Sequence, residues 1–347
     1  MASAILHIKD SYYFEVPKVL WPSTYKSLDE LPPTLDFLKQ EAKEHGHSIA
    51  EVNHELAGKI IIPQPLGKLK GFYAAESGFC ISKFMVIETI IAILLVAIFT
   101  KLAPKIASGT APKGYFWNAF EALLLFVRDG IARPAIDSHD EHDHSQDEPH
   151  HQEQEQFGVG HIHGAVHHHD GDKFLPILWT MFFFILTCNL FGLLPWLGSP
   201  TGSFAVTLAL AGITFLTSII AGSFKFGPLG FWFNQVPSMD LPVYMFPLKI
   251  GIFLIEVLGL CIKHAILAVR LLANMVAGHL VLLAVLGLIV TSAEAGEKFF
   301  GTYGIVTFIS VLGSTAFSCL ELFVAFLQAY VFTFLSALFI GAATHKH

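Results

Sequence analysis

Charged side chains are scarce in this sequence: only 14% of its 347 residues are Asp, Glu, Lys or Arg, whereas 53% are hydrophobic. Soluble domains carry about 25% charged residues, so we expect most of this chain to lie in lipid. Basic clusters are also missing and the formal net charge is −7, which excludes the positively charged surface of a nucleic-acid-binding protein. Most acidic residues come from the first 80 residues and from the tract 137–172, so this charge does not describe the apolar part.

Cysteine and the common nucleotide and metalloprotease motifs are equally sparse. The four cysteines are scattered and form no CxxC pattern, so we expect neither a metal site of that type nor a disulfide framework. No GxxxxGK(S/T) loop occurs, which excludes nucleotide binding by a P-loop, and the HExxH metalloprotease motif is absent as well. The first residues lack a basic region followed by a sustained apolar run, so we expect no cleavable signal peptide.

Long apolar runs predict five membrane helices. Phe84–Leu102, Phe174–Leu194 and Phe204–Ser223 are each long enough to cross a hydrocarbon core of about 30 Å. Val243–Thr291 and Phe299–Ala343 are more than twice that length and have neither a proline nor a charged turn near the centre. Each could break into two spans, but we favour a single, strongly tilted helix whose tilt is imposed by a partner. The fold class is an all-α polytopic membrane protein whose last two helices form an antiparallel hairpin.

A sixth helix is expected to lie in the membrane interface. Tyr115–Ile131 carries its large apolar residues on one face and its charges elsewhere, a pattern typical of an interfacial helix, and we expect it to end before Pro134. Lys101, Lys105 and Lys113 follow the first span, so the positive-inside rule places that end in the cytoplasm. This predicts an N-terminus outside, a C-terminus in the cytoplasm, and a location in the bacterial inner membrane.

Composition divides the chain into five segments. Residues 1–80 are mixed in polarity and broken by prolines, which predicts an extracytoplasmic segment with little packed core. Residues 81–136 hold the first span and the interfacial helix, and 137–172 form a His/Asp/Glu-rich insert that we expect to be disordered. Residues 173–224 form a transmembrane hairpin, and 225–347 the two long helices that carry the ion path.

The insert raises the question of a metal site. Its closely spaced histidines, among them His161, His163 and His167, are of the kind that binds zinc, nickel or copper. The tract offers little hydrophobic sequence with which to build a rigid site. We therefore favour a solvated loop and keep these three histidines as alternative metal ligands. No other cofactor is expected.

Arg270 is the most informative residue of the chain, because it lies deep in an otherwise apolar helix. An arginine at membrane depth costs at least ~2.5–3.5 kcal/mol on insertion scales. A guanidinium does not lose its proton at physiological pH. Such a charge is unsuited to carrying a proton, but it is suited to blocking a proton path or to holding a carboxylate in its ionised form.

Helical spacing places other polar and small residues on the same helical face as Arg270. At ~100° per residue, Glu256 and Asn274 fall within about 40° of Arg270. Ala277 and Gly278 flank the same face, which suits close approach by another helix. His279 falls near 180°, on the opposite face, which predicts that it belongs to a second pathway.

The last helix supplies a matching polar set. Glu321 and Gln328 are seven residues apart and therefore share one helical face. One antiparallel register sets Arg270 level with Gln328 and His279 level with Glu321. A His–Glu pair suits a proton relay, because imidazole titrates near neutral pH and a carboxylate tunes it. Taken singly, Gln328 or Asn274 is equally typical of a hydrogen-bonded helix contact.

Two runs resemble subunit a of F-type ATP synthases: RLLANMVAGH at Arg270–His279 and LQAYVF at Leu327–Phe332. FVRD at Phe126–Asp129 is similar to the same family, and the resemblance covers about 81–343. It implies a stator subunit that lies beside a rotating ring of c subunits and is joined to peripheral-stalk b subunits. Protons would enter by one half-channel, protonate a ring carboxylate and leave by another. Nucleotide chemistry would belong to other subunits.

The resemblance also implies roles for single residues. Arg270 matches the arginine that separates the half-channels, and Gln328 the glutamine opposite it. His279 and Glu321 match an acid–base pair of the inlet half-channel, and Glu256 a carboxylate on the outlet side. Ala277 and Gly278 would pack at the face towards the ring. Gly192 departs from the pattern, because some members carry an aspartate there, so the group that replaces this carboxylate is an open question.

Two other functions compete with this one. A secondary ion transporter or channel would need inverted repeats and broken helices near the membrane midplane, and the sequence shows neither. An intramembrane metalloenzyme would have to use His264, His279 and Glu321. The sequence leaves H⁺ and Na⁺ as alternatives, since ring residues choose the ion. It encodes neither the size of the ring nor the physiological direction of transport.

Overall fold

The computed structural model describes residues 10–107, 114–136, 170–194, 197–234, 246–294 and 300–344. Two compact units make up the chain, and their boundaries fall within the long helices. Unit 1 comprises Met1–Ile98, Phe184–Leu208 and Ala268–Gln328. Unit 2 comprises Phe99–Phe183, Ala209–Leu267 and Ala329–His347.

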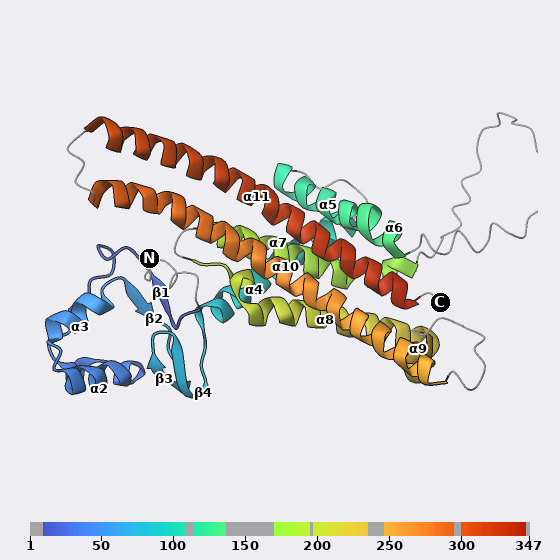
Figure 1. Cartoon of the computed structure of the whole chain (residues 1–347), viewed down its shortest axis with the longest axis horizontal. Helices are drawn as coiled ribbons and strands as arrows, with labels where there is room; N and C mark the ends of the chain where they lie inside the picture. Colours follow the sequence, from blue (N-terminus) through green and yellow to red (C-terminus); the bar gives the residue numbers. More distant parts are fainter. Residues whose placement is uncertain are drawn as a thin grey trace, which may run out of the picture. The chain divides into compact units, whose positions relative to one another are not determined.

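The N-terminal part of unit 1 contains two small antiparallel sheets (Figure 1). β1 (Tyr13–Glu15) pairs with β2 (Lys59–Ile61). β3 (Leu66–Gly71) pairs with β4 (Ala74–Phe79), and the register of this pair is irregular beyond Lys68. Each sheet has only two strands, which is too few for a stable sheet on its own. The sheets therefore depend on packing against neighbouring elements.

Two short helices, α2 (Asp36–His45) and α3 (Ile49–Leu56), lie between β1 and β2 in the sequence. α2 is followed by the capping residue Gly46, whose φ of 68° lies in the left-handed region that favours glycine. α3 is preceded by the capping residue Ser48, which forms a capping box with Glu51. Such a cap satisfies two backbone N–H groups that would otherwise lack partners at the start of the helix.

A small hydrophobic core joins these helices to the preceding loop, so the expectation of little packed core in residues 1–80 was wrong. The prolines do not prevent packing, because they lie at the edges of elements. Pro33 begins the short helix η2 (Pro33–Leu35), and Pro63 and Pro65 lie in the connection between β2 and β3. The buried residues of this core are Leu31, Leu35, Leu38, Ala42, Val52 and Leu56.

Five helices in the described part of the chain are long and apolar enough to cross a membrane, which confirms the predicted number. They are α4 (Lys83–Ala107), α7 (Leu175–Gly192), α8 (Phe204–Phe226), α10 (Phe246–Glu294) and α11 (Phe300–Thr344). A short helix η6 (Pro200–Gly202) connects α7 to α8, and α9 (Pro228–Asn234) follows α8. The chain is therefore a mostly helical, multi-pass membrane protein.

The last two helices are each continuous, as their sequences predict. α10 has 49 residues and α11 has 45, which correspond to about 74 Å and 68 Å at ~1.5 Å per residue. Within unit 1 they run antiparallel and are joined by side-chain hydrogen bonds (Figure 1). Both helices exceed the ~30 Å hydrocarbon core, so their strong tilt stays a prediction that only a membrane environment can test.

The predicted interfacial helix is present in unit 2, but it does not end before Pro134. α5 (Tyr115–Val127) continues through a π-helical turn, η3 (Arg128–Ala132), into α6 (Arg133–Ile136). In a regular α-helix the proline ring would clash with the carbonyl four residues before it. Here the wider turn changes the hydrogen bonding, and the Arg133 N–H donates to the Arg128 carbonyl five residues earlier. This turn accommodates the proline.

Polar contacts fix α5 and α6 within unit 2. The Trp179 indole N–H on α7 donates to the Leu124 carbonyl at 3.0 Å. Arg133 forms a two-pronged ion pair with Asp172 of the short helix η5 (Asp170–Phe174), both bonds being 3.1 Å. Planar guanidinium–carboxylate pairs of this kind fix orientation as well as distance. These contacts hold the α5–α6 segment against the N-terminal part of α7.

Candidate functional site

Two polar pairs join α10 to α11 within unit 1. Asn274 Nδ2 donates to Gln328 Oε1 at 2.8 Å, and His279 Nδ1 lies 3.2 Å from Glu321 Oε1. The structure thus confirms the predicted pairing of His279 with Glu321. Gln328 bonds to Asn274, about one turn along α10 from Arg270, rather than to Arg270 itself.

The apolar contact between the helices explains why Asn274 and His279 both reach α11. Leu271, Met275 and Gly278 form a buried stripe on α10. Asn274 lies at one edge of this stripe and His279 at the other. The helical projection placed His279 opposite Arg270, but it did not show that the interface with α11 lies between Asn274 and His279. The two polar pairs therefore border one helix contact.

Gly278 has a different place from the one predicted. It is buried, and a Cβ added to it would lie 2.5 Å from Glu321 Oε1. Glycine is therefore needed to make room for the carboxylate within the chain, and Gly278 does not share the outward face of Ala277. Ala277 is exposed, as are Val269 and Ala273. These small and apolar residues form an uncovered face beside Arg270.

Arg270 itself is half-buried and lies at the edge of this uncovered face. Its Nε atom is buried and has no hydrogen-bond partner among the described residues. A guanidinium offers five N–H donors in a fixed plane. The side chain is therefore a permanent positive charge with donor capacity that the described part of the chain leaves unused.

A cavity of about 20 Å³ lies beside Glu321 and the Asn274–Gln328 pair. Two atoms on its polar lining residues, Glu321 Oε2 and Gln328 Nε2, are buried without a hydrogen-bond partner in the described residues. The residues that line the cavity are Asn189, Leu193, Leu271, Asn274, Met275, Glu321, Val324, Ala325 and Gln328. α7 thus contributes one wall of this site.

No role was predicted for the polar groups that α7 and the following loop bring to this cavity, although Asn189 belongs to a run, Phe182–Leu190, that is similar to the family. Asn189 is buried and bonds to the Thr201 hydroxyl at 2.8 Å, and Thr201 bonds to Ser199 at 2.8 Å. Ser199 also lies where a side chain at Gly192 would have to go: a Cβ there would be 2.7 Å from Ser199 Oγ. Serine and threonine are common in membrane proteins, so no sequence signal singled out Ser199 or Thr201.

Several predicted site residues lie elsewhere. Glu256 is half-buried on α10 in unit 2. His264 is buried, its Nδ1 is 2.9 Å from the Leu260 carbonyl, and its ring packs between Phe215 and Phe339. It therefore acts as a packing residue.

Among the residues described, no three His, Cys, Asp or Glu side chains are grouped as metal ligands would be. The candidate ligands His161, His163 and His167 lie outside the described residues. Their prediction as a solvated loop or as metal ligands therefore stays a prediction.

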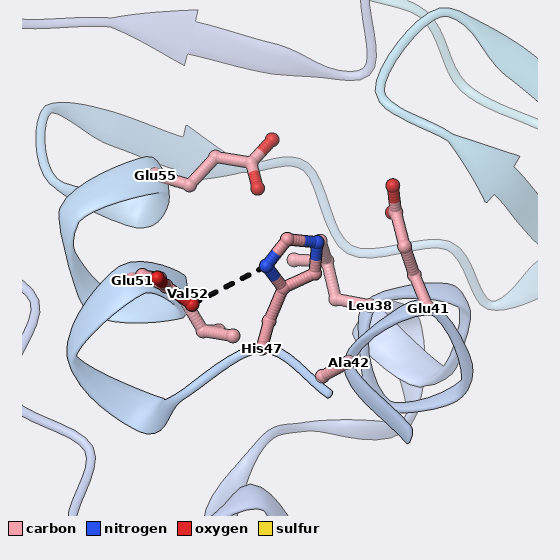
Figure 2. Close-up of a pocket in the computed structure, with 7 residues that line it drawn as sticks. All are labelled: Leu38, Glu41, Ala42, His47, Glu51, Val52 and Glu55. Carbon is pink, nitrogen blue, oxygen red and sulfur yellow. Dashed lines mark hydrogen bonds and ion pairs between the residues drawn. The ribbon is translucent and has the colours of Figure 1, made fainter. Parts of the chain in front are cut away.

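A second pocket, in the N-terminal part, has about 280 Å³ and three glutamates in its wall (Figure 2). Its His47 lies 3.3 Å from Glu51 Oε2. The Ser48 backbone N–H, which donates to Glu51, holds the pKa of that carboxyl below its usual range. The position and ionisation of the Glu51 carboxylate thus follow from its part in the N-terminal cap of α3.

The ATP synthase A chain family matches residues 156–341, which include both polar pairs and Arg270. The chain belongs to this family. It is 36% identical over 270 residues to ATP synthase subunit a of Myxococcus xanthus, which covers 77% of this chain and 75% of that relative. It is 32% identical over 312 residues to subunit a of Chlorobium phaeobacteroides, with 88% and 78% covered. A subunit a of Anaeromyxobacter dehalogenans is 45% identical over 178 residues, 51% of this chain and 44% of that relative.

Family membership confirms the resemblance carried by RLLANMVAGH and LQAYVF. As a subunit a, the chain belongs to the F-type ATP synthase complex and is its proton-translocating stator subunit. It has no nucleotide chemistry of its own. The family match does not include the small sheets and helices of the N-terminal part, since it begins at residue 156.

Proposed function

We propose that Arg270 separates two offset half-channels formed against a ring of c subunits. The observation that supports this is a half-buried guanidinium with a buried, unpartnered Nε, as far as the described residues extend, beside an uncovered face of small and apolar residues. An ionised carboxylate on a passing ring helix would pair with this charge. A protonated one would not, so protons would have to leave the ring before reaching Arg270 and join it again afterwards. Because arginine keeps its proton, it cannot short-circuit the two paths.

The His279–Glu321 pair is proposed as the proton relay of the inlet half-channel. Their contact of 3.2 Å is close enough for direct transfer between imidazole and carboxylate. Asn274 and Gln328, on the neighbouring turn, would guide the proton from this pair to the ring. Glu256 is proposed as the carboxylate of the outlet half-channel. The transported ion is H⁺ in this assignment, because imidazole relays protons and not sodium ions.

The proposed partners are the c-ring at the Arg270 face, peripheral-stalk b subunits and membrane lipid. We expect the subunit to lie in a bacterial inner membrane with its N-terminus outside and its C-terminus in the cytoplasm. Lys105 Nζ, near the end of α4, lies 3.7 Å from the centre of the Trp117 ring on α5. Lysine and tryptophan both favour the membrane interface, which supports an interfacial α5 on the cytoplasmic side.

Cysteine cross-linking tests the proposed ring contact. In a chain whose four free cysteines have been replaced by serine, Ala277→Cys should form a disulfide with a cysteine in the outer helix of a c subunit. Ala92→Cys on α4 is the matched control, because Ala92 is also exposed and belongs to the same unit. Cross-linking of Ala92→Cys alone, or of neither variant in assembled complexes, would contradict the placement of the ring.

A further inference from the structure

A chain of buried polar groups reaches the cavity beside Glu321 from the loop between α7 and α8. Ser199, Thr201 and Asn189 are 4%, 0% and 2% exposed. They are linked in that order by two hydrogen bonds of 2.8 Å, and Asn189 Nδ2 donates to the Ala325 carbonyl of α11 at 3.3 Å. Burying polar groups is costly unless each is paired. A series of three paired, buried polar side chains is therefore expected to serve a purpose.

The partners fix the direction of every bond in this chain. The Ala325 carbonyl can only accept, so the Asn189 amide must turn its NH₂ towards α11 and its oxygen towards Thr201. The single hydroxyl proton of Thr201 then goes to Asn189. Consequently Ser199 must donate to Thr201. The Asn189 amide is thereby held in one orientation, with its second N–H left for the cavity that Asn189 lines.

The cavity has the size and the chemistry of a site for one water molecule. Its volume of about 20 Å³ exceeds the ~10–15 Å³ that one water requires. Gln328 Nε2 is a donor and Glu321 Oε2 an acceptor, and both are buried without a partner in the described residues. Among the residues that line the cavity, only Glu321 is titratable, and its carboxylate also faces His279 from α10.

We propose that this cavity binds one water molecule and that Asn189, fixed by Thr201 and Ser199, is the positioning residue that holds it. The water accepts hydrogen bonds from the Asn189 and Gln328 amides and donates one to Glu321. Three bonds are the usual number for a buried water. The loop after α7 thereby orders the inlet path, and Ser199 and the Met275 side chain share the space that Gly192 leaves open.

The role of this water in transport rests on the proposed function. The proton moves directly between His279 and Glu321: the N–H bond of the imidazolium breaks as an O–H bond forms on the carboxylate. The water donates its hydrogen bond to the ionised carboxylate. The water itself gains and loses no proton, and it stabilises the ionised form of Glu321 between transfers. The amides carry no proton in this scheme. They aim the water, which is why the orientation of Asn189 matters.

Direct observation of the water is the first test. In an electron cryo-microscopy map of the complete ATP synthase that resolves ordered waters, we expect one density in the cavity. It should lie within about 3.2 Å of the Asn189, Glu321 and Gln328 polar atoms. If side chains occupy this space and the map shows no water density, the proposal is overturned, whatever the transport activity of the complex.

Substitution of Thr201 is the second test, with ATP-driven proton pumping in membrane vesicles as the measurement. Thr201→Val keeps the shape, removes the hydroxyl and lets the Asn189 amide turn, so pumping should fall about fivefold, the equivalent of one lost hydrogen bond. Thr201→Ser keeps the hydroxyl and should restore pumping. Thr207→Val is the matched control, because Thr207 is equally buried but bonds only to its own helix and the residue before it.

The outcomes separate this proposal from the proposed function. If Thr201→Val and Thr207→Val complexes assemble equally and pump equally well, the positioning role is wrong while the proton-translocating function stands. If Thr201→Ser is as defective as Thr201→Val, packing rather than the hydroxyl is responsible, and the role is again wrong. Absence of pumping in wild-type vesicles that contain assembled complex would instead contradict the proposed function.

Discussion

Two buried glutamines show how the N-terminal part differs from the α10–α11 contact. Gln64 uses both ends of its amide: it donates to the Ile81 carbonyl at 2.8 Å and accepts from the Ile81 N–H at 2.7 Å. Gln328 accepts from Asn274, but its Nε2 is buried without a partner in the described residues. In Gln64 both the amide oxygen and the amide nitrogen have hydrogen-bond partners, and these bonds join two loops. Gln328 keeps a donor available.

The same contrast holds for other side chains of the two regions. Asn53 accepts hydrogen bonds from Ser23 and from the Tyr25 N–H, and it donates to the Tyr25 carbonyl. Arg270 and Glu321 each keep a buried atom without a partner among the residues described. An unpaired buried polar atom costs about 1–3 kcal/mol. The N-terminal part is thus built for stability, whereas the helix contact retains polar atoms that transport can use.

The largest effect is expected at Arg270. Arg270→Ala removes the permanent charge and should abolish ATP-driven proton pumping in vesicles that contain assembled complex. Arg270→Lys should also largely abolish pumping. The lysine ammonium lacks the planar set of N–H donors of a guanidinium, and it can lose its proton. Pumping near the wild-type rate in Arg270→Ala would show that the unpartnered guanidinium has no part in transport.

Exchange of the relay pair should have the next largest effect. His279→Glu or Glu321→His alone leaves two like groups or an unpaired charge in a site of low polarity, which costs about 3–5 kcal/mol for a broken buried pair. The double exchange restores one acid and one base at the same depth, so it should pump better than either single variant. Residues in contact are expected to be coupled in this way. Additive defects in the pumping rates would argue against a functional pair.

The two glutamines allow the comparison to be tested directly. Gln328→Leu should lower pumping by about tenfold while the complex assembles normally, since it removes a donor used in transport and one hydrogen bond to Asn274. Gln64→Leu should leave pumping per assembled complex unchanged. It should instead make the N-terminal segment of the intact complex more sensitive to protease, because both polar atoms of the Ile81 backbone lose their partner. The reverse pattern would refute the distinction between the two regions.

The smallest effect is expected for the His-rich insert. Its composition gives it neither a core nor a rigid metal site, so deletion of residues 139–169 should leave assembly and pumping within about twofold of wild type. Pumping should be measured with and without added zinc. Loss of assembly, or an effect of zinc that disappears with the deletion, would show that the insert has a role of its own.

The membrane helices and one polar pair could be predicted from sequence because they depend on regular periods. Hydropathy over a fixed length defines the five spans, and the seven-residue spacing of Glu321 and Gln328 sets a register in which His279 meets Glu321. These features depend on single helices or on one antiparallel pairing. The hydropathy and the spacing of polar residues along the sequence are therefore enough to predict them.

Other features depend on packing that no period encodes. Gly278 is needed because the Glu321 carboxylate lies against it, a contact between distant segments. The Ser199–Thr201–Asn189 chain uses common residues brought together by a short loop. The N-terminal core was missed because its leucines are interrupted by prolines that in fact begin or connect elements. Small residues and loops of this kind acquire meaning only in the folded chain.

The π turn at Arg128–Ala132 has a consequence for how this family can vary. Such a turn holds one residue more than the α-helix around it and so absorbs an insertion without rotating the next helical residues. Beyond it, the Ala135 carbonyl lies so close to Gly341 of α11 that a Cβ there would be only 2.6 Å away. A relative with one residue fewer in the turn could keep this contact, but its helix would no longer admit Pro134. The extra residue and the proline should therefore be gained or lost together in evolution.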